Sequence, residues 1–165
     1  MAYSETAQVL LPSILDRLID DNPESDRDPI DDPLDALHKI QNSIARDLEQ
    51  LLNTRLYWPE TPPYLSELKH SLLNYGIPDF STVSLGSEEH KEVFVAMILD
   101  AIKHFEPRFR KVDIEILENH DKEDRTLRFR TQAWLEIEPN PLAVVFDSQI
   151  DAIERALRVK VSNHG

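Results

Sequence analysis

A glutamate set between two phenylalanines is the feature of this sequence that most suggests catalysis. Glu106 stands in the run Phe105-Glu106-Pro107-Arg108-Phe109. A glycosidase uses an apolar setting of this kind to keep one carboxylic acid protonated for proton donation. Arg108 lies only two residues away, however, and a neighbouring guanidinium favours the ionised carboxylate. We therefore expect Glu106 and Arg108 to form a structural clamp across the turn that Pro107 fixes.

Other catalytic and ligand-binding chemistries find little support in the residue types. The six histidines are scattered, no HExxH pattern occurs, and the chain has no cysteine. The three glycines are also scattered, which excludes a glycine-rich phosphate loop, and no Gly-x-Ser-x-Gly sequence occurs. We therefore predict no catalytic residues, no cofactor and no metal ion.

The composition indicates one acidic domain. The chain has 165 residues, 31 of them acidic and 18 basic, which gives a net charge of −13. Like charges repel a phosphate backbone, so we expect no nucleic-acid partner. No apolar stretch approaches the roughly 20 residues of a membrane-spanning helix, and the first residues do not resemble a signal peptide. We therefore expect a cytoplasmic protein with no direct membrane insertion.

Residues 1–32 are predicted to be a mobile acidic arm. Between positions 20 and 35 there are eight acids, one base and three prolines, too polar a composition to offset the entropy of ordering. Before it, four apolar residues share one helical face: Ile14, Leu15, Leu18 and Ile19. This piece is too short to be a stable helix alone. Two interpretations stay open, a frayed terminus or a peptide that docks on a partner.

Residues 33–165 are predicted to form a single α+β domain. Apolar residues at helical spacing predict about three helices, over 33–55, 61–74 and 87–105, with Ser87 capping the last and Gly76 following the second. After Pro107 the apolar period changes from about 3.6 to 2. The alternation predicts a hairpin of strands around 112–116 and 127–137 and a third strand from Val144. The residues after Ile150 fit either a helix or a fourth strand, and we favour the strand. The fold class is then helices followed by a small antiparallel sheet of three to four strands.

Several segments together resemble a known family. They are Pro12-Ser-Ile-Leu-Asp-Arg-Leu18, Ser43-Ile-Ala-Arg-Asp-Leu-Glu-Gln-Leu-Leu-Asn-Thr-Arg55, Ser71-Leu-Leu-Asn-Tyr-Gly-Ile-Pro-Asp79, Phe105-Glu-Pro-Arg-Phe109 and Val145-Phe-Asp147. In this order they resemble the TssE family of baseplate subunits of the bacterial type VI secretion system. That family is similar to the lysozyme-like wedge protein of contractile phage tail baseplates. The residues around Ile153 depart from the glycine-containing turn expected in the family.

The resemblance implies assembly rather than catalysis. TssE proteins sit in the cytoplasmic baseplate beside TssF, TssG and TssK, and they help to nucleate the contractile sheath of TssB and TssC. Carried over to this chain, Glu106, Pro107 and Arg108 form a structural and assembly motif. Two alternatives remain: a peptidoglycan hydrolase, as the lysozyme label suggests, and an unrelated cytoplasmic adaptor.

Two segments are candidate partner-binding sites. The first is the N-terminal piece Ile14, Leu15, Asp16, Arg17 and Leu18, which we expect to dock on the wedge. The second is the C-terminal segment with Arg155, Leu157, Arg158 and Lys160. An edge strand has unpaired N–H and C=O groups to which a partner strand can add. The positive charge of this segment would favour an acidic partner strand.

Overall fold

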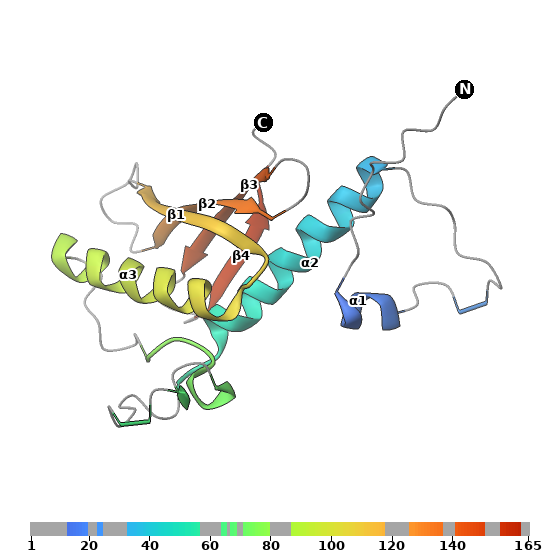
Figure 1. The fold of residues 1–165 in the computed structure, drawn as a ribbon. Helices are drawn as coiled ribbons and strands as arrows, with labels where there is room; N and C mark the ends of the chain where they lie inside the picture. The colour runs from blue at the N-terminus through green and yellow to red at the C-terminus, as the bar shows by residue number, and fades with distance from the viewer. Residues whose placement is uncertain are drawn as a thin grey trace.

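Two long helices and a four-stranded antiparallel sheet dominate the described part of the chain (Figure 1). The computed structural model describes residues 13–19, 23–24, 33–56, 64–65, 67–68, 71–79, 87–117, 126–136, 141–150 and 156–162. The helices are α1 (Ile14–Leu18), α2 (Pro33–Asn53) and α3 (Glu88–Phe105), with a 3-10 helix η2 (Leu72–Asn74) between α2 and α3. The strands, in their order across the sheet, are β1 (Phe109–Leu117), β2 (Leu127–Leu135), β3 (Leu142–Ile150) and β4 (Leu157–Val161). The predicted α+β class is therefore confirmed.

Helix α2 forms where the sequence predicts its first helix. It begins at Pro33, whose fixed φ suits the first helical position, and it ends at Asn53, close to the predicted end. Its apolar residues recur every three or four positions and are buried, namely Ile40, Ile44, Leu48, Leu51 and Leu52. This apolar face binds the helix to the rest of the core.

The prediction of a second helix, over residues 61–74, is wrong for the described residues. Between positions 54 and 86 the described segments contain no α-helix, and residues 71–79 hold only the three-residue η2. Leu72 and Leu73, two of the apolar residues on which the helix over 61–74 was predicted, are exposed. Ile77 is instead the fully buried residue here. Short helices depend on a packed apolar face, and these leucines have none, so an α-helix is not stabilised.

Gly76 fixes the return of this segment to α2. The amide of Ile77 donates to the carbonyl of Thr54, and the amide of Leu56 donates to the carbonyl of Ile77, both at 3.0 Å. Gly76 has φ of +115°, and a Cβ there would lie 2.4 Å from the Thr54 oxygen. Only glycine adopts this φ readily and fits so close to the other backbone.

Helix α3 and the strands follow the predicted periodicities. Helix α3 begins directly after Ser87, although the Ser87 hydroxyl makes no capping hydrogen bond. Val112 lies opposite Ala133 and Ala133 opposite Val144, and the register of β1 against β2 shifts once, between Phe109 and Lys111. The C-terminal segment is strand β4, as favoured over a helix. The turn predicted near residues 153–155 lies outside the described residues.

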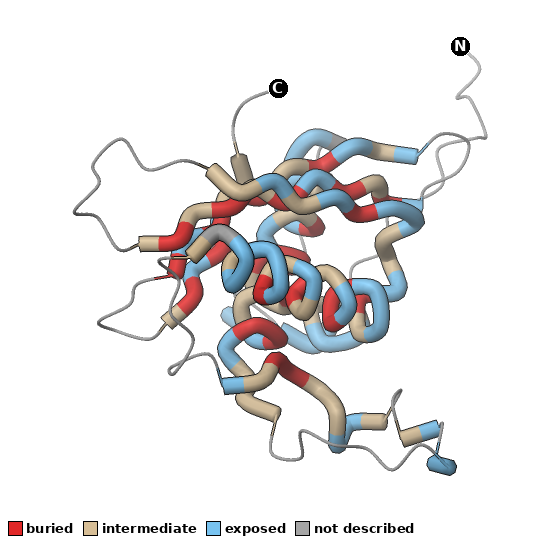
Figure 2. Tube along the Cα trace, turned by 90° about the vertical axis from the view of Figure 1, so that its left-hand side faces the viewer, coloured by how far each residue is buried: buried red, intermediate tan, exposed pale blue. Residues whose placement is uncertain are grey.

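The core lies between the sheet and the two long helices (Figure 2). Helix α2 packs against β4, helix α3 packs against β1, and the two helices contact each other. Phe94 of α3 and Phe129 and Phe146 of the sheet are among the largest fully buried side chains of this core. Burial alternates along β2 and β3, so the opposite face of the sheet is left without a described helix over it.

Candidate assembly site

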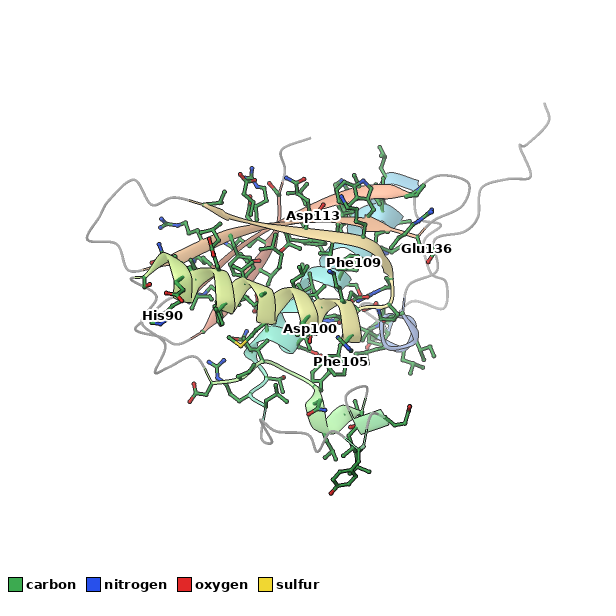
Figure 3. The ribbon with its side chains drawn as sticks, turned by 60° about the vertical axis from the view of Figure 1, so that its left-hand side comes forward. His90, Asp100, Phe105, Phe109, Asp113 and Glu136 are labelled. Carbon is green, nitrogen blue, oxygen red and sulfur yellow. The ribbon has the colours of Figure 1, made fainter. Side chains whose placement is uncertain are left out.

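Glu106 and Arg108 form a clamp at the junction of α3 and β1. Glu106 ends α3, and its amide donates to the Ile102 carbonyl at 2.9 Å. The Nε of Arg108 donates to Glu106 Oε1 at 2.5 Å, and the Nη2 of Arg108 donates to Glu106 Oε2. Glu106 is only 5% exposed, and Figure 3 shows Phe105 and Phe109 on the two elements that meet here. The predicted contact is confirmed, while its role in assembly remains a prediction.

Asp47 of α2 completes the site. The Nη2 of Arg108 also donates to Asp47 Oδ2 at 2.8 Å. One guanidinium thus joins α2 to the start of β1. Burial acts to lower the pKa of Arg108, but the hydrogen bonds and charges of Glu106 and Asp47 outweigh it and raise that pKa. Arg108 therefore keeps its charge and holds both carboxylates in place.

Tyr75 lies at the border of this charged group. Its ring makes an edge-to-face contact with Phe105, with the centroids 5.3 Å apart. Burial first, and then the charges of Asp47 and Glu106, raise the pKa of Tyr75. The burial of Glu106 removes its carboxylate from water, which strengthens its ionic hydrogen bonds to Arg108.

A second acidic residue attaches α1 to α2. Asp16 accepts hydrogen bonds from the hydroxyls of Ser13 and Ser43, both at 2.5 Å, and forms an ion pair with Arg46 at 2.8 Å. Burial acts to raise the pKa of Asp16, but these three partners together lower it to about 2. The carboxylate is therefore ionised at neutral pH and fixes α1 against α2.

The two attachments are parts of one chain of alternating charges, which we call the charge ladder: Asp16, Arg46, Asp47, Arg108 and Glu106. Its middle link is the ion pair between Arg46 and its neighbour Asp47, at 2.9 Å. The hydrogen bonds that Arg46 donates to Asp47 and Asp16 raise the pKa of Arg46. The ladder runs from α1 across α2 to the junction of α3 and β1. Sequentially distant segments that resemble the TssE family thus meet in one polar network.

The apolar residues of α1 face away from this network. Ile14 and Leu18 are more than three-quarters exposed, and Leu15 and Ile19 are at least half exposed. The side chain of Arg17 lies outside the described residues. The predicted docking segment thus presents an open apolar surface, while its single acid holds it to the domain. That a partner covers this surface remains a prediction.

The C-terminal partner-binding residues do not share one environment. Leu157 is buried in the core, whereas Arg158 and Lys160 are exposed on the other face of the sheet. Arg155 lies outside the described residues. The strand alternation divides the predicted patch between the two faces.

The free edge of β4 is closed along its first three residues. The amide of Ser162 donates to β3, so the even-numbered residues of β4 face β3 and the odd-numbered ones face outward. The outward N–H and C=O of Leu157 bind the side chain of Asn53, at 2.9 and 2.8 Å. The outward N–H of Val159 donates to Glu49 at 2.9 Å. Side chains of α2 thus occupy the backbone groups that a partner strand would need.

Comparison with known proteins places this arrangement in a family. A family model described as "Baseplate wedge protein gp25" matches residues 38–140, which is more than half of the chain. The chain belongs to this baseplate wedge family. TssE is the type VI secretion homologue of the same wedge protein, so the family agrees with the resemblance found in the sequence. No curated protein and no solved structure matches the chain.

Membership of the baseplate wedge family supports a structural role in a baseplate, in contact with other baseplate components. The matched residues reach from within α2 past the end of β2. They include Asp47, Glu106 and Arg108, but they leave out α1 and Asp16. Four of the five residues of the charge ladder therefore lie within the matched region, and only Asp16, on α1, lies outside it.

Sequence reasoning missed the residues of α2 that hold these elements. Ser43, Arg46, Asp47, Glu49 and Asn53 stand between the apolar positions of α2 and look like an ordinary solvated helix face. One signal was available, because Asn53 and Glu49 are four residues apart and share a helical face. Their partners, however, lie more than a hundred residues away, which no local pattern indicates.

Beyond the charge ladder, the described residues also form one groove of note. A shallow groove of about 500 Å³ runs between α2 and β4, lined by Asn42, Ala45, Arg46, Glu49, Val159, Lys160 and Val161. Within the described ranges, no group of three or more histidines and acids is arranged to hold a metal ion. The helices of the described ranges are too short or too polar to cross a bilayer.

Proposed function

We propose that this chain is a non-enzymatic structural subunit of a type VI secretion baseplate wedge and helps to nucleate the contractile sheath. The observation that carries the proposal is the family match over residues 38–140, which includes the clamp of Glu106 and Arg108. The segments that resemble TssE favour the secretion system over a phage tail. Its partners are then TssF, TssG and TssK in the wedge and TssB and TssC in the sheath. It works on the cytoplasmic side of the membrane, without nucleic acid and without inserting into the bilayer.

Residues 33–165 act in this proposal as one wedge domain, and residues 1–32 act as an acidic arm. The exposed residues Ile14, Leu15 and Leu18 of α1 supply an apolar surface of the kind that anchors a peptide on a partner. Deleting residues 1–20 should therefore weaken wedge binding while the domain stays folded. The variant I14S/L18S tests the apolar residues alone, and unchanged binding of both variants would contradict the proposed arm.

Strand addition is the proposed route to the sheath, and β1 offers the better edge. Just after β2 ends, the amide of Glu136 donates to the carbonyl of Arg108, just before β1. The backbone groups of even-numbered β2 residues therefore point to β1, and from Lys111 onward these residues pair with odd-numbered residues of β1. The even-numbered residues of β1 therefore direct their N–H and C=O outward: Val112, Ile114 and Ile116. No hydrogen bond joins these outward groups to any described residue. The β4 edge, by contrast, is occupied by Asn53 and Glu49.

Two substitutions at Ile114 distinguish the effect of the backbone N–H at the β1 edge from the effect of the side chain. Ile114→Pro removes an outward N–H of β1 but leaves the backbone hydrogen bonds between β1 and β2 in place. Ile114→Ala shortens the same side chain and keeps the N–H. We expect the proline variant to lose most sheath binding and the alanine variant to retain it. Circular dichroism and melting would establish that both variants fold. Equal sheath binding by both would contradict addition at β1.

The hydrolase alternative has no support in the geometry of the site. A retaining or inverting glycosidase needs a carboxylic acid that is free to donate a proton to its substrate. Glu106 is instead buried and engaged by Arg108 through both carboxylate oxygens. The site is arranged to join three elements of the fold, which is a structural task.

The first experiment is a tagged pull-down from lysate of the native cell, with the partners identified by mass spectrometry. Recovery of TssF, TssG, TssK or the sheath subunits is the expected result. A folded bait that recovers none of them, in cells that express them, would contradict the secretion assignment. An assay for peptidoglycan hydrolysis on the same material would then test the lysozyme-like alternative.

A further inference from the structure

The outer face of the sheet is positively charged in an otherwise acidic chain. This face is the one opposite the core, and no described helix lies over it. The strand register places on it five cations, Lys111, Arg128, Arg130, Arg158 and Lys160, and three acids, Asp113, Glu115 and Asp147. The net charge of these eight residues is +2. The whole chain has a net charge of −13, so its other residues together have −15. Such a separation of charge orients the protein toward an acidic partner.

An apolar strip lies beside these charges. Trp134 of β2 is opposite Ala143 of β3, and Val145 follows two residues later on the same face. Ala143 is exposed, and Trp134 and Val145 are partly exposed. The ammonium of Lys111 lies 4.7 Å from the centre of a Trp134 ring. A tryptophan bordered by charge is the usual composition of a protein interface, in which an aromatic residue anchors the contact and a polar rim surrounds it.

The acids of the face are mostly engaged with its own cations. Arg130 donates to Asp147 at 2.7 Å, and Lys111 binds Asp113 at 2.6 Å. Lys160, opposite Asp147 on β4, is exposed. The cations hold the carboxylates in place and still outnumber them, so the field above the strip remains positive.

We infer that the outer face of the sheet, anchored by Trp134 and bordered by Lys111, Arg130 and Lys160, docks an acidic surface of another baseplate or sheath protein. The inference rests on the proposed function for the identity of the assembly. It differs from strand addition, because it uses side chains on the flat face and leaves the backbone edge of β1 free. A nucleic acid fits less well, since the three acids of the face and the net charge of the chain repel phosphates.

Zero-length crosslinking tests which acid lies over the face. The assembly is isolated through a tag on the full chain and treated with a carbodiimide, which joins lysine amines to carboxyl groups in direct contact. We expect Lys111 and Lys160 to join to Asp or Glu residues of another protein. Lys103, exposed on α3, serves as the internal control and should not join to that protein. Crosslinks of Lys111 and Lys160 only to this chain or to a second copy, or none at all, would overturn the inference.

Charge reversal separates this inference from the proposed function. In the variant K111E/K160E, we expect recovery of the crosslinked protein to fall about tenfold relative to the unmodified chain, and added salt to weaken the unmodified complex in the same direction. K103E makes the same kind of change on α3 and should leave recovery unchanged, and melting checks that each variant folds. Full recovery with K111E/K160E would refute docking on this face alone. Failure of the unmodified chain to recover any baseplate protein would refute the proposed function.

Discussion

Arg46 and Asp47 are neighbours on α2, yet they serve two attachments that differ in their surroundings. Asp47 reaches Arg108, which also holds the buried Glu106 beside the rings of Phe105 and Tyr75. Arg46 reaches Asp16 of α1, whose apolar residues point into solvent. The charged groups are of the same types and the distances are similar. Ion pairs contribute according to how far their partners are removed from water, so the two attachments differ in energy although their chemistry is alike.

The comparison separates a fixed part of the molecule from a detachable one. Arg108 is needed to keep a carboxylate satisfied inside the domain, and removing Arg108 disturbs the core. Helix α1 has five residues and is held mainly by polar contacts, so it opens at a low free energy without unfolding the rest. If α1 docks on a partner, as proposed above, this weaker attachment would let it move there without unfolding the domain.

The largest effect is expected for Arg108→Ala. This change leaves Glu106 buried without its partner and should lower the free energy of unfolding by about 3 kcal/mol. Urea denaturation measures the loss. Arg108→Lys is the matched control, because it keeps the charge but loses the paired hydrogen bonds, and it should cost less. An unchanged urea midpoint for Arg108→Ala would contradict the fixed role given to this attachment.

Asp47→Asn should have an intermediate effect. It weakens the hydrogen bond between α2 and Arg108 but leaves Glu106 paired, so a loss of about 1 kcal/mol is expected in the same urea experiment. A double-mutant cycle with Arg108→Lys should show coupling between the two positions. Additive losses would mean that Asp47 stabilises the domain through some other contact.

Asp16→Asn should leave the stability of the domain unchanged to within about 0.5 kcal/mol. It should nevertheless release α1 from α2, because the ion pair with Arg46 is lost. Limited trypsin digestion measures the release of α1, because cleavage after Arg17 should become faster. Asp35→Asn, at an exposed acid near the start of α2, makes the same change elsewhere and should not alter the cleavage rate. Equal rates in all three proteins would show that Asp16 does not hold α1.

The smallest effect is a pH dependence of the same contact. The folded pKa of Asp16 is about 2, below its ordinary value of 3.8. The stabilisation is therefore fully present above about pH 4 and is lost as the pH falls through 2. Amide signals of residues 13–19 in NMR spectra should report this change, and Asp16→Asn should abolish it. A release of α1 between pH 5 and 7 would point to another titrating group.

Local chemistry was predictable from the sequence, and long-range chemistry was not. The Glu106–Arg108 clamp joins residues two positions apart, and the strands follow from strict alternation, so both were predicted. Asp47 lies 61 residues from Arg108, and Asn53 lies 104 residues from Leu157. Periodicity tells which face of α2 is apolar, but it does not tell what its polar face touches. The prediction of a helix over 61–74 was wrong for a related reason, because Ile77, rather than Leu72 or Leu73, is buried in the core.

The contacts of Asn53 and Glu49 with β4 limit how many chains the sheet can join. A sheet with two free sides would recruit a neighbour on each and grow without end. With the β4 side occupied by Asn53 and Glu49, a strand could add to this sheet only along β1. Even two copies that met side to side would stop at a pair. The same two side chains that hold β4 against α2 thus leave β1 as the open edge, so under the proposed function one copy of this chain would offer one site for an added strand.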